Sequence, residues 1–266
     1  MGVLFVGAVV GLSDCAAAPL QSAIFSELGG GVWVLEKEKP VRKAVLRSRV
    51  GGKSSVKTGE QSRAELEFDD KSLVRLGSNA IYAFQPGTRS MRLDIGALLL
   101  FVPKGSGGAT TISTATATAT ISGTTVIISA TKSGGFRMLV LEGVADVRYA
   151  DGKRIRCRAG DMTVLPGAGA EPSGPNKVDV KSVMASSGLI KRFSKKLPSL
   201  PLIAAVIQTQ EGLLASGQMQ PSGGLFGDSS LEPWGDRDRI RSVEIRTSTQ
   251  KDIRDNRPRY TKPNRP

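Results

Sequence analysis

The side chains that most often carry out chemistry in proteins are scarce in this sequence. Histidine is absent from the 266 residues, which excludes Ser-His-Asp and Cys-His triads, histidine metal sites and imidazole proton relays. Cysteine occurs twice, as Cys15 and Cys157, too few for a disulfide framework or a cysteine-rich zinc site. The sequence therefore predicts no catalytic residue, no metal site and no cofactor.

Two remaining patterns could still suggest catalysis or phosphate binding. Asp69 and Asp70, or Asp94, could supply a carboxylate pair for glycoside cleavage, but Asp69 and Asp70 fall where a turn is expected. Residues 104–108 are glycine-rich, but they lack the Gly-Lys-Ser/Thr ending that leads into a helix in a phosphate loop. We interpret both patterns as turns and expect a protein that is not an enzyme.

The strong positive charge favours an anionic partner. Lys and Arg number 37 against 24 Asp and Glu, a formal net charge of +13. Arg154, Arg156 and Arg158 share one face of an expected strand, and residues 237–265 are arginine-rich. Because aromatic residues that could stack on bases are sparse there, nucleic acid is not the expected partner. We expect an anionic envelope polymer, a lipid or an acidic protein instead.

The N-terminus indicates export. Residues 3–12 form an apolar run that is too short to span a bilayer but fits the apolar region of a signal peptide, and three alanines at 16–18 follow it. No Lys or Arg precedes the run. We predict a signal peptide over residues 1–23 and a periplasmic or outer-envelope protein. The residues around Cys15 also resemble a lipobox, so lipid anchoring is an alternative, and a buried N-terminal strand or helix is another.

Residues 41–168 show the alternation typical of half-buried strands. In residues 63–68 apolar side chains alternate with charged ones, and residues 154–158 repeat the pattern with Ile155 and Cys157 on the inward face. Turn-forming residues separate these runs at spacings near ten. The sequence therefore predicts a mainly β protein whose domain over 41–168 is a solenoid-like or sandwich arrangement of short strands.

The threonine-rich tract at residues 110–122 admits three interpretations. Threonine is stiff and β-branched, and its alternation with alanine favours one long strand packed closely on another sheet. A low-complexity linker is one alternative, and a threonine ladder of the ice-binding kind is the other. We expect the long strand.

The region after the β domain changes character. A Gly/Pro-rich exit follows Pro166, and residues 177–212 then show two helical patterns, the second opened by Ser199 as its N-cap and closed by Gly212. Apolar content falls after this segment. We predict a helical appendix over 177–212 and a disordered basic tail over 213–266.

Five short motifs in the middle of the chain resemble those of the FecR domain family, in the family's order. They lie at residues 57–77, 93–99, 121–126, 141–144 and 159–161. The residues that carry the resemblance are Gly59, Ser62, Leu66, Leu76, Gly77, Gly96, Gly123, Thr124, Glu142, Gly143 and Gly160. Two departures are Lys71, where the family has glycine, and Asp161, where it has glutamine.

The resemblance implies an exported, all-β, FecR-like domain. In that family the domain is the periplasmic sensor half of an inner-membrane regulator, which contacts a TonB-dependent transducer and controls a sigma factor. The sequence shows no cytoplasmic helical domain before the motifs and no spanning helix, so we do not expect the anti-sigma role. We expect a binding or signalling module that acts by contact with a protein partner in the cell envelope. The alternative is a carbohydrate-binding or structural envelope module.

Overall fold

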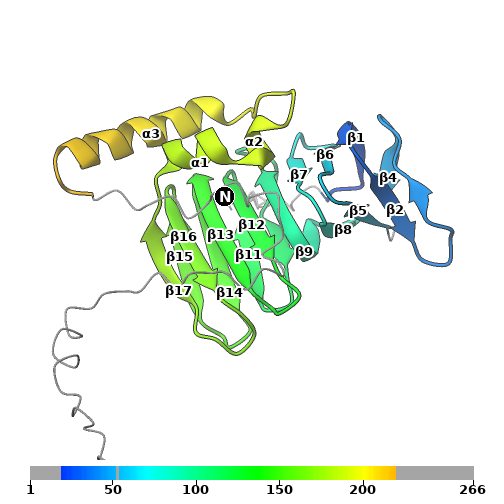
Figure 1. Cartoon of the computed structure of the whole chain (residues 1–266), viewed down its shortest axis with the longest axis horizontal. Coiled ribbons are helices and arrows are strands. Elements are labelled where there is room, and N and C mark those ends of the chain that lie inside the picture. The colour runs from blue at the N-terminus through cyan, green and yellow to red at the C-terminus, as the bar shows by residue number, and fades with distance from the viewer. Residues whose placement is uncertain (1–18, 52–53, 220–266) are drawn as a thin grey trace, which may run out of the picture. The chain divides into compact units, whose positions relative to one another are not determined.

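The computed structural model describes residues 19–51 and 54–219, and the fold there is mainly β, as predicted (Figure 1). The strands are β1 (Ser22–Gly29), β2 (Val32–Glu36), β3 (Arg42–Lys43), β4 (Arg49–Gly51), β5 (Ser54–Thr58), β6 (Arg63–Phe68), β7 (Leu73–Leu76), β8 (Ile81–Gln85), β9 (Ser90–Phe101), β10 (Thr110–Ser113), β11 (Ala117–Ile121), β12 (Thr125–Ala130), β13 (Phe136–Glu142), β14 (Val144–Tyr149), β15 (Arg154–Arg158), β16 (Asp161–Leu165) and β17 (Ser173–Lys177). The helices are α1 (Val180–Ser186), α2 (Gly188–Lys191) and α3 (Leu200–Ala215).

The strands form two layers that share one long strand. The first layer, the covered sheet, has the order β4-β1-β6-β7-β9-β12-β13-β16-β17. The second, the open sheet, has the order β3-β2-β5-β8-β9-β10-β11-β14-β15. Neighbours are antiparallel except β9 and β10, which are parallel. The arrangement is thus a sandwich whose chain passes repeatedly between the layers.

Strand β9 joins the two layers through a bend at Gly96. Its first half pairs with β8 and β10 in the open sheet, and its second half pairs with β7 and β12 in the covered sheet. Gly96 has φ +98°, and a β-carbon there would lie 2.5 Å from the Cα of Ala80. Glycine is needed at this bend because other residues rarely adopt that φ and because no room exists for a side chain.

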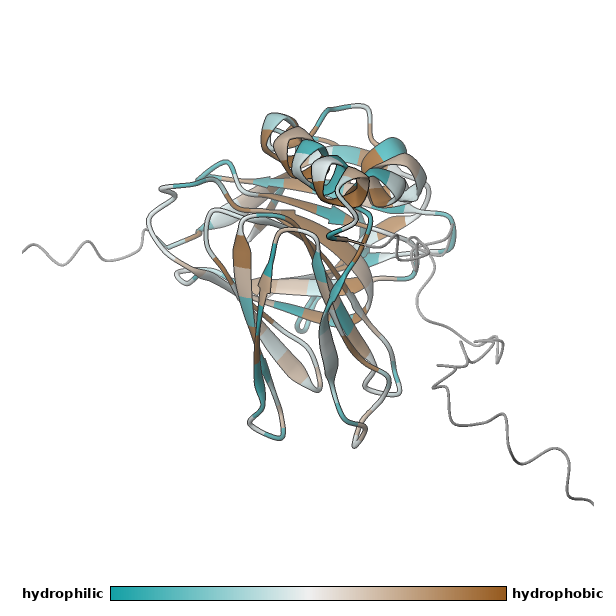
Figure 2. Ribbon diagram, turned by 90° about the vertical axis from the view of Figure 1, so that its left-hand side faces the viewer, coloured by the Kyte–Doolittle hydropathy of each residue, from teal (hydrophilic) through white to brown (hydrophobic). Residues whose placement is uncertain are grey.

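Two apolar layers stabilise the fold. The larger fills the space between the sheets and includes Phe25, Leu98 and Phe136. The smaller lies between the outer face of the covered sheet and the three helices, where Leu99 and Leu139 pack with helical residues (Figure 2). No described element covers the outer face of the open sheet. None of the described helices is long and apolar enough to cross a membrane.

The β domain is longer than the predicted span of 41–168. Strands β1 and β2 precede residue 41, and their inward side chains, including Phe25 and Val34, are fully buried between the sheets. Strand β17 continues the covered sheet past residue 168, through the segment interpreted as an exit. Most of the predicted signal peptide, residues 1–18, lies outside the described residues, although Leu20 is buried and β1 begins at Ser22.

The threonine-rich tract is a hairpin, so the prediction of one long strand was wrong. Strands β10 and β11 pair antiparallel around a turn at Thr114–Thr116. The hydroxyl of Thr114 accepts a hydrogen bond from the backbone N–H of Ala117 (3.1 Å) and so closes the turn without glycine or proline. Thr116 donates to the carbonyl of Gly134 (2.8 Å), which ties this turn to the neighbouring hairpin.

The helical segment also differs from its predicted boundaries and caps. Helix α3 continues through Ala215, so Gly212 lies within it and does not end it. Ser199 precedes α3, but its side chain makes no capping bond and is instead hydrogen-bonded to the Thr125 hydroxyl (2.8 Å) on the covered sheet. Residues 213–215 are helical, and the rest of the predicted tail from residue 220 lies outside the described residues.

Candidate binding surface

The motif glycines lie where the chain passes from one sheet to the other. Five of these corners join different strands, and the sixth is the bend in β9. The corner glycines are Gly59 (β5 to β6), Gly77 (β7 to β8), Gly96 (within β9), Gly123 (β11 to β12), Gly143 (β13 to β14) and Gly160 (β15 to β16). The motif glycines therefore lie at positions where the fold requires the chain to turn from one sheet to the other.

The motif hydroxyls join neighbouring corners. Ser62 accepts a hydrogen bond from the backbone N–H of Gly31 (2.9 Å), and the Gly59 N–H donates to the Gly31 carbonyl (2.9 Å). Thr124 donates to the Val144 carbonyl (2.9 Å). These bonds satisfy backbone groups that a corner would otherwise leave unpaired, and each one ties a corner to its neighbour.

The other motif residues are buried. Leu66 and Leu76 lie in the apolar layer between the sheets. Glu142 lies on the covered sheet near the start of α3 and accepts a hydrogen bond from the Thr125 hydroxyl (2.9 Å). Burial raises the pKa of Glu142, against the lowering effects of Thr125 and Lys104. These positions give the motif residues contacts inside the protein and leave no motif side chain on an exposed sheet face.

The exposed surface with the most regular chemistry is the outer face of the open sheet. A row of hydroxyl groups crosses it from Ser90 on β9 to Thr111 on β10 and Thr120 on β11. Arg92 on β9 and Arg148 on β14 lie on the same face, and both are exposed. From β9 to β15 the surface is therefore a polar and mainly basic platform, carried by paired strands.

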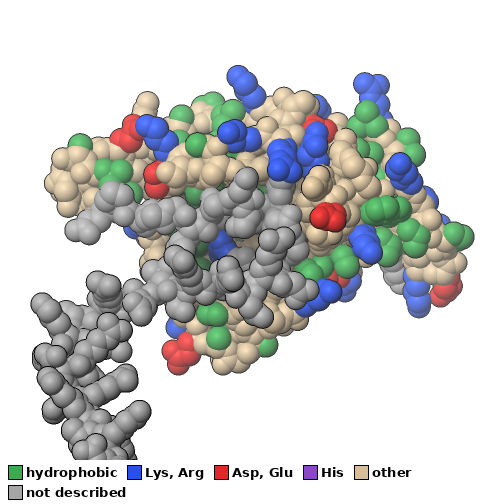
Figure 3. All heavy atoms as spheres, in the orientation of Figure 1, with side chains coloured by type: hydrophobic (Ala, Val, Ile, Leu, Met, Phe, Trp, Pro, Cys, Tyr) green, Lys and Arg blue, Asp and Glu red, His purple; other side chains and the backbone are tan. Residues whose placement is uncertain are grey.

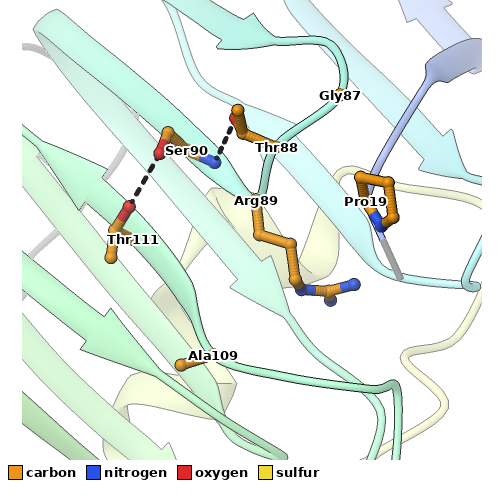
Figure 4. A pocket seen from close by; sticks show the side chains of 7 residues that line it. All are labelled: Pro19, Gly87, Thr88, Arg89, Ser90, Ala109 and Thr111. Carbon is orange, nitrogen blue, oxygen red and sulfur yellow. Dashed lines mark hydrogen bonds between the residues drawn. The ribbon is translucent and has the colours of Figure 1, made fainter. Parts of the chain in front are cut away.

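A small pocket adjoins one end of this platform (Figure 4). It has a volume of about 260 Å³ and is lined by Pro19, Gly87, Thr88, Arg89, Ser90, Ala109 and Thr111. The hydroxyls of Ser90 and Thr111 are 3.3 Å apart, while the Arg89 side chain points away from them (Figure 4). Arg89 is buried and bonds to Asp70 (2.5 Å), which joins the wall of the pocket to the turn between β6 and β7.

The carboxylates that the sequence offered as catalytic candidates have structural partners. Asp70 accepts a hydrogen bond from the Ser72 N–H (2.8 Å) and closes the turn between β6 and β7, where Lys71 adopts φ +67°. Asp69 accepts from the Ser22 N–H (3.2 Å), and Asp94 pairs with Arg92 (2.8 Å). The glycine-rich residues 104–108 form a turn, as predicted. Among the described residues, no cluster of three or more metal-ligating side chains occurs.

Strand β15 confirms the predicted alternation around Cys157. The cysteine is fully buried, while Arg154, Arg156 and Arg158 are exposed. Burial raises the pKa of the Cys157 thiol to about 12, and the nearby charge of Asp161 adds to the shift. Because the thiolate is the reactive form of cysteine, this residue is a packing group.

The sequence analysis missed Arg148, which faces β15 on the same surface. Arg148 lies directly opposite Arg154, and Asp146 lies opposite Arg156. Asp146 binds Arg156 through two contacts of 2.8 and 3.0 Å. The alternation of Val147, Arg148 and Tyr149 could have placed Arg148 on this face, but its cross-strand partner depends on the register of the hairpin.

Basic side chains also predominate over acidic ones on the face of the molecule shown in Figure 3.

Comparison with known proteins identifies the central part of the sandwich. The family described as "FecR protein" matches residues 54–148. Residues 54–148 form a FecR domain. The FecR match begins at β5 and ends within β14, so the flanking strands extend the same two sheets beyond the matched region.

Two solved structures resemble the chain at low sequence identity. Both are crystal structures of a "putative anti-sigma factor" from Parabacteroides distasonis ATCC 8503, at 1.65 and 2.50 Å resolution. Their identities to this chain are 14% and 13%, with TM-scores of 0.45 and 0.42. Each match covers 49% of this chain and 63% of the other, less than two thirds of those proteins. No curated protein matches the sequence.

Proposed function

We propose that this protein is an extracytoplasmic, non-enzymatic binding or signalling module that contacts a protein partner through the open sheet. The observation that carries the proposal is a difference between the outer faces of the two sheets. Helices α1 to α3 pack on the covered sheet, whereas no described element lies on the open sheet. An uncovered sheet face of this kind suits recognition of a partner without any chemical step.

The helices are held on the covered sheet by more than apolar contact. Arg75 on β7 and Glu65 on β6 form a fully buried ion pair of 2.8 Å. Arg75 also donates to the carbonyls of Leu189 (3.3 Å) and Lys195, and its guanidinium lies 4.6 Å from the ring centroid of Phe193. Removing the helices would leave a buried charge pair without these partners, so the covered face is not the free surface.

Export remains a prediction from the N-terminal sequence. The apolar run and alanines at residues 3–18 support it. Mass spectrometry of the native protein should find a mature N-terminus between about residues 15 and 24, the range set by the signal-peptide pattern. An intact Met1 on the native protein would contradict export.

The arginine-rich tail is proposed to add a weaker, salt-dependent attraction. Its residues carry an excess of positive charge, which favours anionic polymers or lipids of the envelope. Nucleic acid is the less favoured partner because stacking aromatics are sparse in the tail. We therefore assign specificity to the β domain and assign only non-specific attraction to the tail.

A pair of charge-reversal variants tests the proposal on the full chain. Lys57→Glu with Arg92→Glu alters two exposed residues of the open sheet, and Lys191→Glu with Lys196→Glu alters two exposed residues on the helical side. In capture from envelope extract, the first variant should lose the specific protein partner at least tenfold, and the second should retain it. The opposite result would place binding on the helical side and overturn the proposal.

The hydroxyl row supports one alternative from a different class. Ser90, Thr111 and Thr120 lie in register beside Arg92, an arrangement that could hydrogen-bond to an anionic sugar polymer. Binding of purified envelope polysaccharide that disappears on Thr111→Val with Thr120→Val would favour this carbohydrate-binding function over protein contact.

A further inference from the structure

One of the four edge strands differs from the other three. Strands β3 and β4 contain two and three residues, and β17 contains Gly174 and Pro175, all of which limit pairing with another strand. Strand β15 at the end of the open sheet has five residues and neither glycine nor proline. It is therefore the edge in the described part of the chain best able to accept a further strand.

The register shows which backbone groups of β15 face outward. The Tyr149 N–H donates to the Lys153 carbonyl (2.9 Å) at one end of the hairpin, and the Ala159 N–H donates to the Gly143 carbonyl (3.0 Å) at the other. Hydrogen-bonded and non-hydrogen-bonded pairs alternate in antiparallel strands. Arg154 and Arg156 are thus in non-hydrogen-bonded pairs with β14, and their N–H and C=O groups point away from the sheet.

The side chains of this edge carry unbalanced positive charge. Arg148 and Arg154 lie directly opposite each other, and like charges in that position destabilise a strand pair. Arg156 is balanced by Asp146, whereas Arg158 lies opposite the apolar Val144. Acidic side chains on a strand added beside β15 would lie next to the arginines and would offset this repulsion.

The layer opposite also leaves a place for an added strand. The corners at Gly143 and Gly160 connect β13 and β16 of the covered sheet to β14 and β15 of the open sheet. The covered sheet then has one further strand, β17, which has no counterpart in the open sheet. All five residues of β17 are exposed. A strand beside β15 would extend the open sheet to match this extra strand.

We propose that β15 is the docking edge for an extended acidic peptide of a protein partner, which adds to the open sheet as a further strand. Acidic residues at alternate positions of the peptide face Arg154, Arg156 and Arg158. Backbone bonds to Arg154 and Arg156 supply affinity, and the alternation supplies specificity. The inference rests on the proposed function and adds to it a contact at the edge of the open sheet, with the chemistry of the peptide that would make it.

Two synthetic peptides of equal composition test the register requirement on the full chain. One alternates Glu with Val, and the other places the same Glu residues consecutively. We expect the alternating peptide to bind at least tenfold more tightly and to slow amide exchange at Arg154 and Arg156. Equal binding of the two peptides, or binding of neither, overturns the proposal.

A matched pair of substitutions separates strand addition from charge attraction. Arg156→Pro removes an outward N–H without breaking the bonds to β14, and Arg156→Ala loses the same side chain but keeps that N–H. Arg156→Pro should lower the affinity for the alternating peptide at least tenfold more than Arg156→Ala does. Protection of Cys157 from thiol reagents checks that both variants fold.

The same pair of variants distinguishes other anionic ligands. Suppose that dextran sulfate or anionic vesicles bind, and that Arg156→Pro and Arg156→Ala weaken binding of the alternating peptide equally. The edge would then be only a charged surface, and strand docking would be wrong. Capture through Lys57 and Arg92 does not involve β15, so that result would leave the proposed function standing.

Discussion

The buried pair of Arg75 and Glu65 is the residue-scale feature on which the covered sheet depends. Both side chains are fully buried, and Arg75 bonds to the segment that carries α2. Arg75→Met should destabilise the protein by about 3–5 kcal/mol, because it leaves Glu65 as an uncompensated buried charge. Urea unfolding measures the loss.

Arg63→Met serves as the control for Arg75→Met. Arg63 pairs with Glu27 at 3.3 Å and lies 5.9 Å from the Phe193 ring, but it is partly exposed. Its loss should lower the free energy of unfolding by less than about 1 kcal/mol. Equal effects of the two substitutions would show that the buried ion pair does not anchor the helices.

Glu142 makes a prediction about pH. Burial raises its pKa in the folded protein above the ordinary value of 4.5. The folded state therefore binds this proton more tightly than the unfolded state, and the contribution of Glu142 to stability falls as pH rises through the folded pKa. Glu142→Gln should be more stable than the parent at about pH 8, and the gain should vanish at about pH 3.5, where the carboxyl is protonated in both states.

The exposed Glu60 provides the matched control for Glu142. Glu60→Gln removes the same single charge from a corner that faces solvent. Its effect on the free energy of unfolding should be small and should not follow the pattern of Glu142→Gln. A gain for Glu142→Gln that persists unchanged into acid would contradict the role assigned to burial.

At the scale of elements, the corners determine whether the two sheets can form together. Gly96→Ala should destabilise the protein by about 3 kcal/mol or more, because strain at φ +98° adds to a clash with Ala80. Gly152→Ala is the control, since Gly152 has φ +89° but no atom near the added β-carbon. It should lose only about 1–2 kcal/mol. Thermal unfolding of the two variants separates the clash from the backbone strain.

The hydropathy pattern of the strands distinguishes the two sheets, and part of it could be predicted. Alternation in β15 identifies a strand with one exposed face. The continuous apolar run at Leu98, Leu99 and Leu100 indicates burial on both faces, as the helices provide. The hairpin at Thr114–Thr116 could not be predicted, because its turn is closed by a threonine side chain and contains neither glycine nor proline.

At the scale of the whole molecule, the order of the motifs predicted the FecR domain but not how far the two sheets extend around it. Strands β1 and β2 were missed because their inward residues, such as Phe25 and Val34, are recognised as core only when the opposite sheet is known. The facing pair of Arg148 and Arg154 was missed for a similar reason, because it depends on the register between β14 and β15. Local patterns thus predict the elements, whereas the candidate binding surface depends on pairing between strands far apart in the sequence.

The most direct test of the central claim is site-specific photo-crosslinking of the full chain in the cells that produce it. A photoreactive residue at Thr120 lies on the open sheet, and one at Gln208 lies on the exposed side of α3. Our account predicts a discrete protein adduct from position 120 and none from position 208. An adduct from position 208 alone would show that the helices carry the binding surface and would contradict the account.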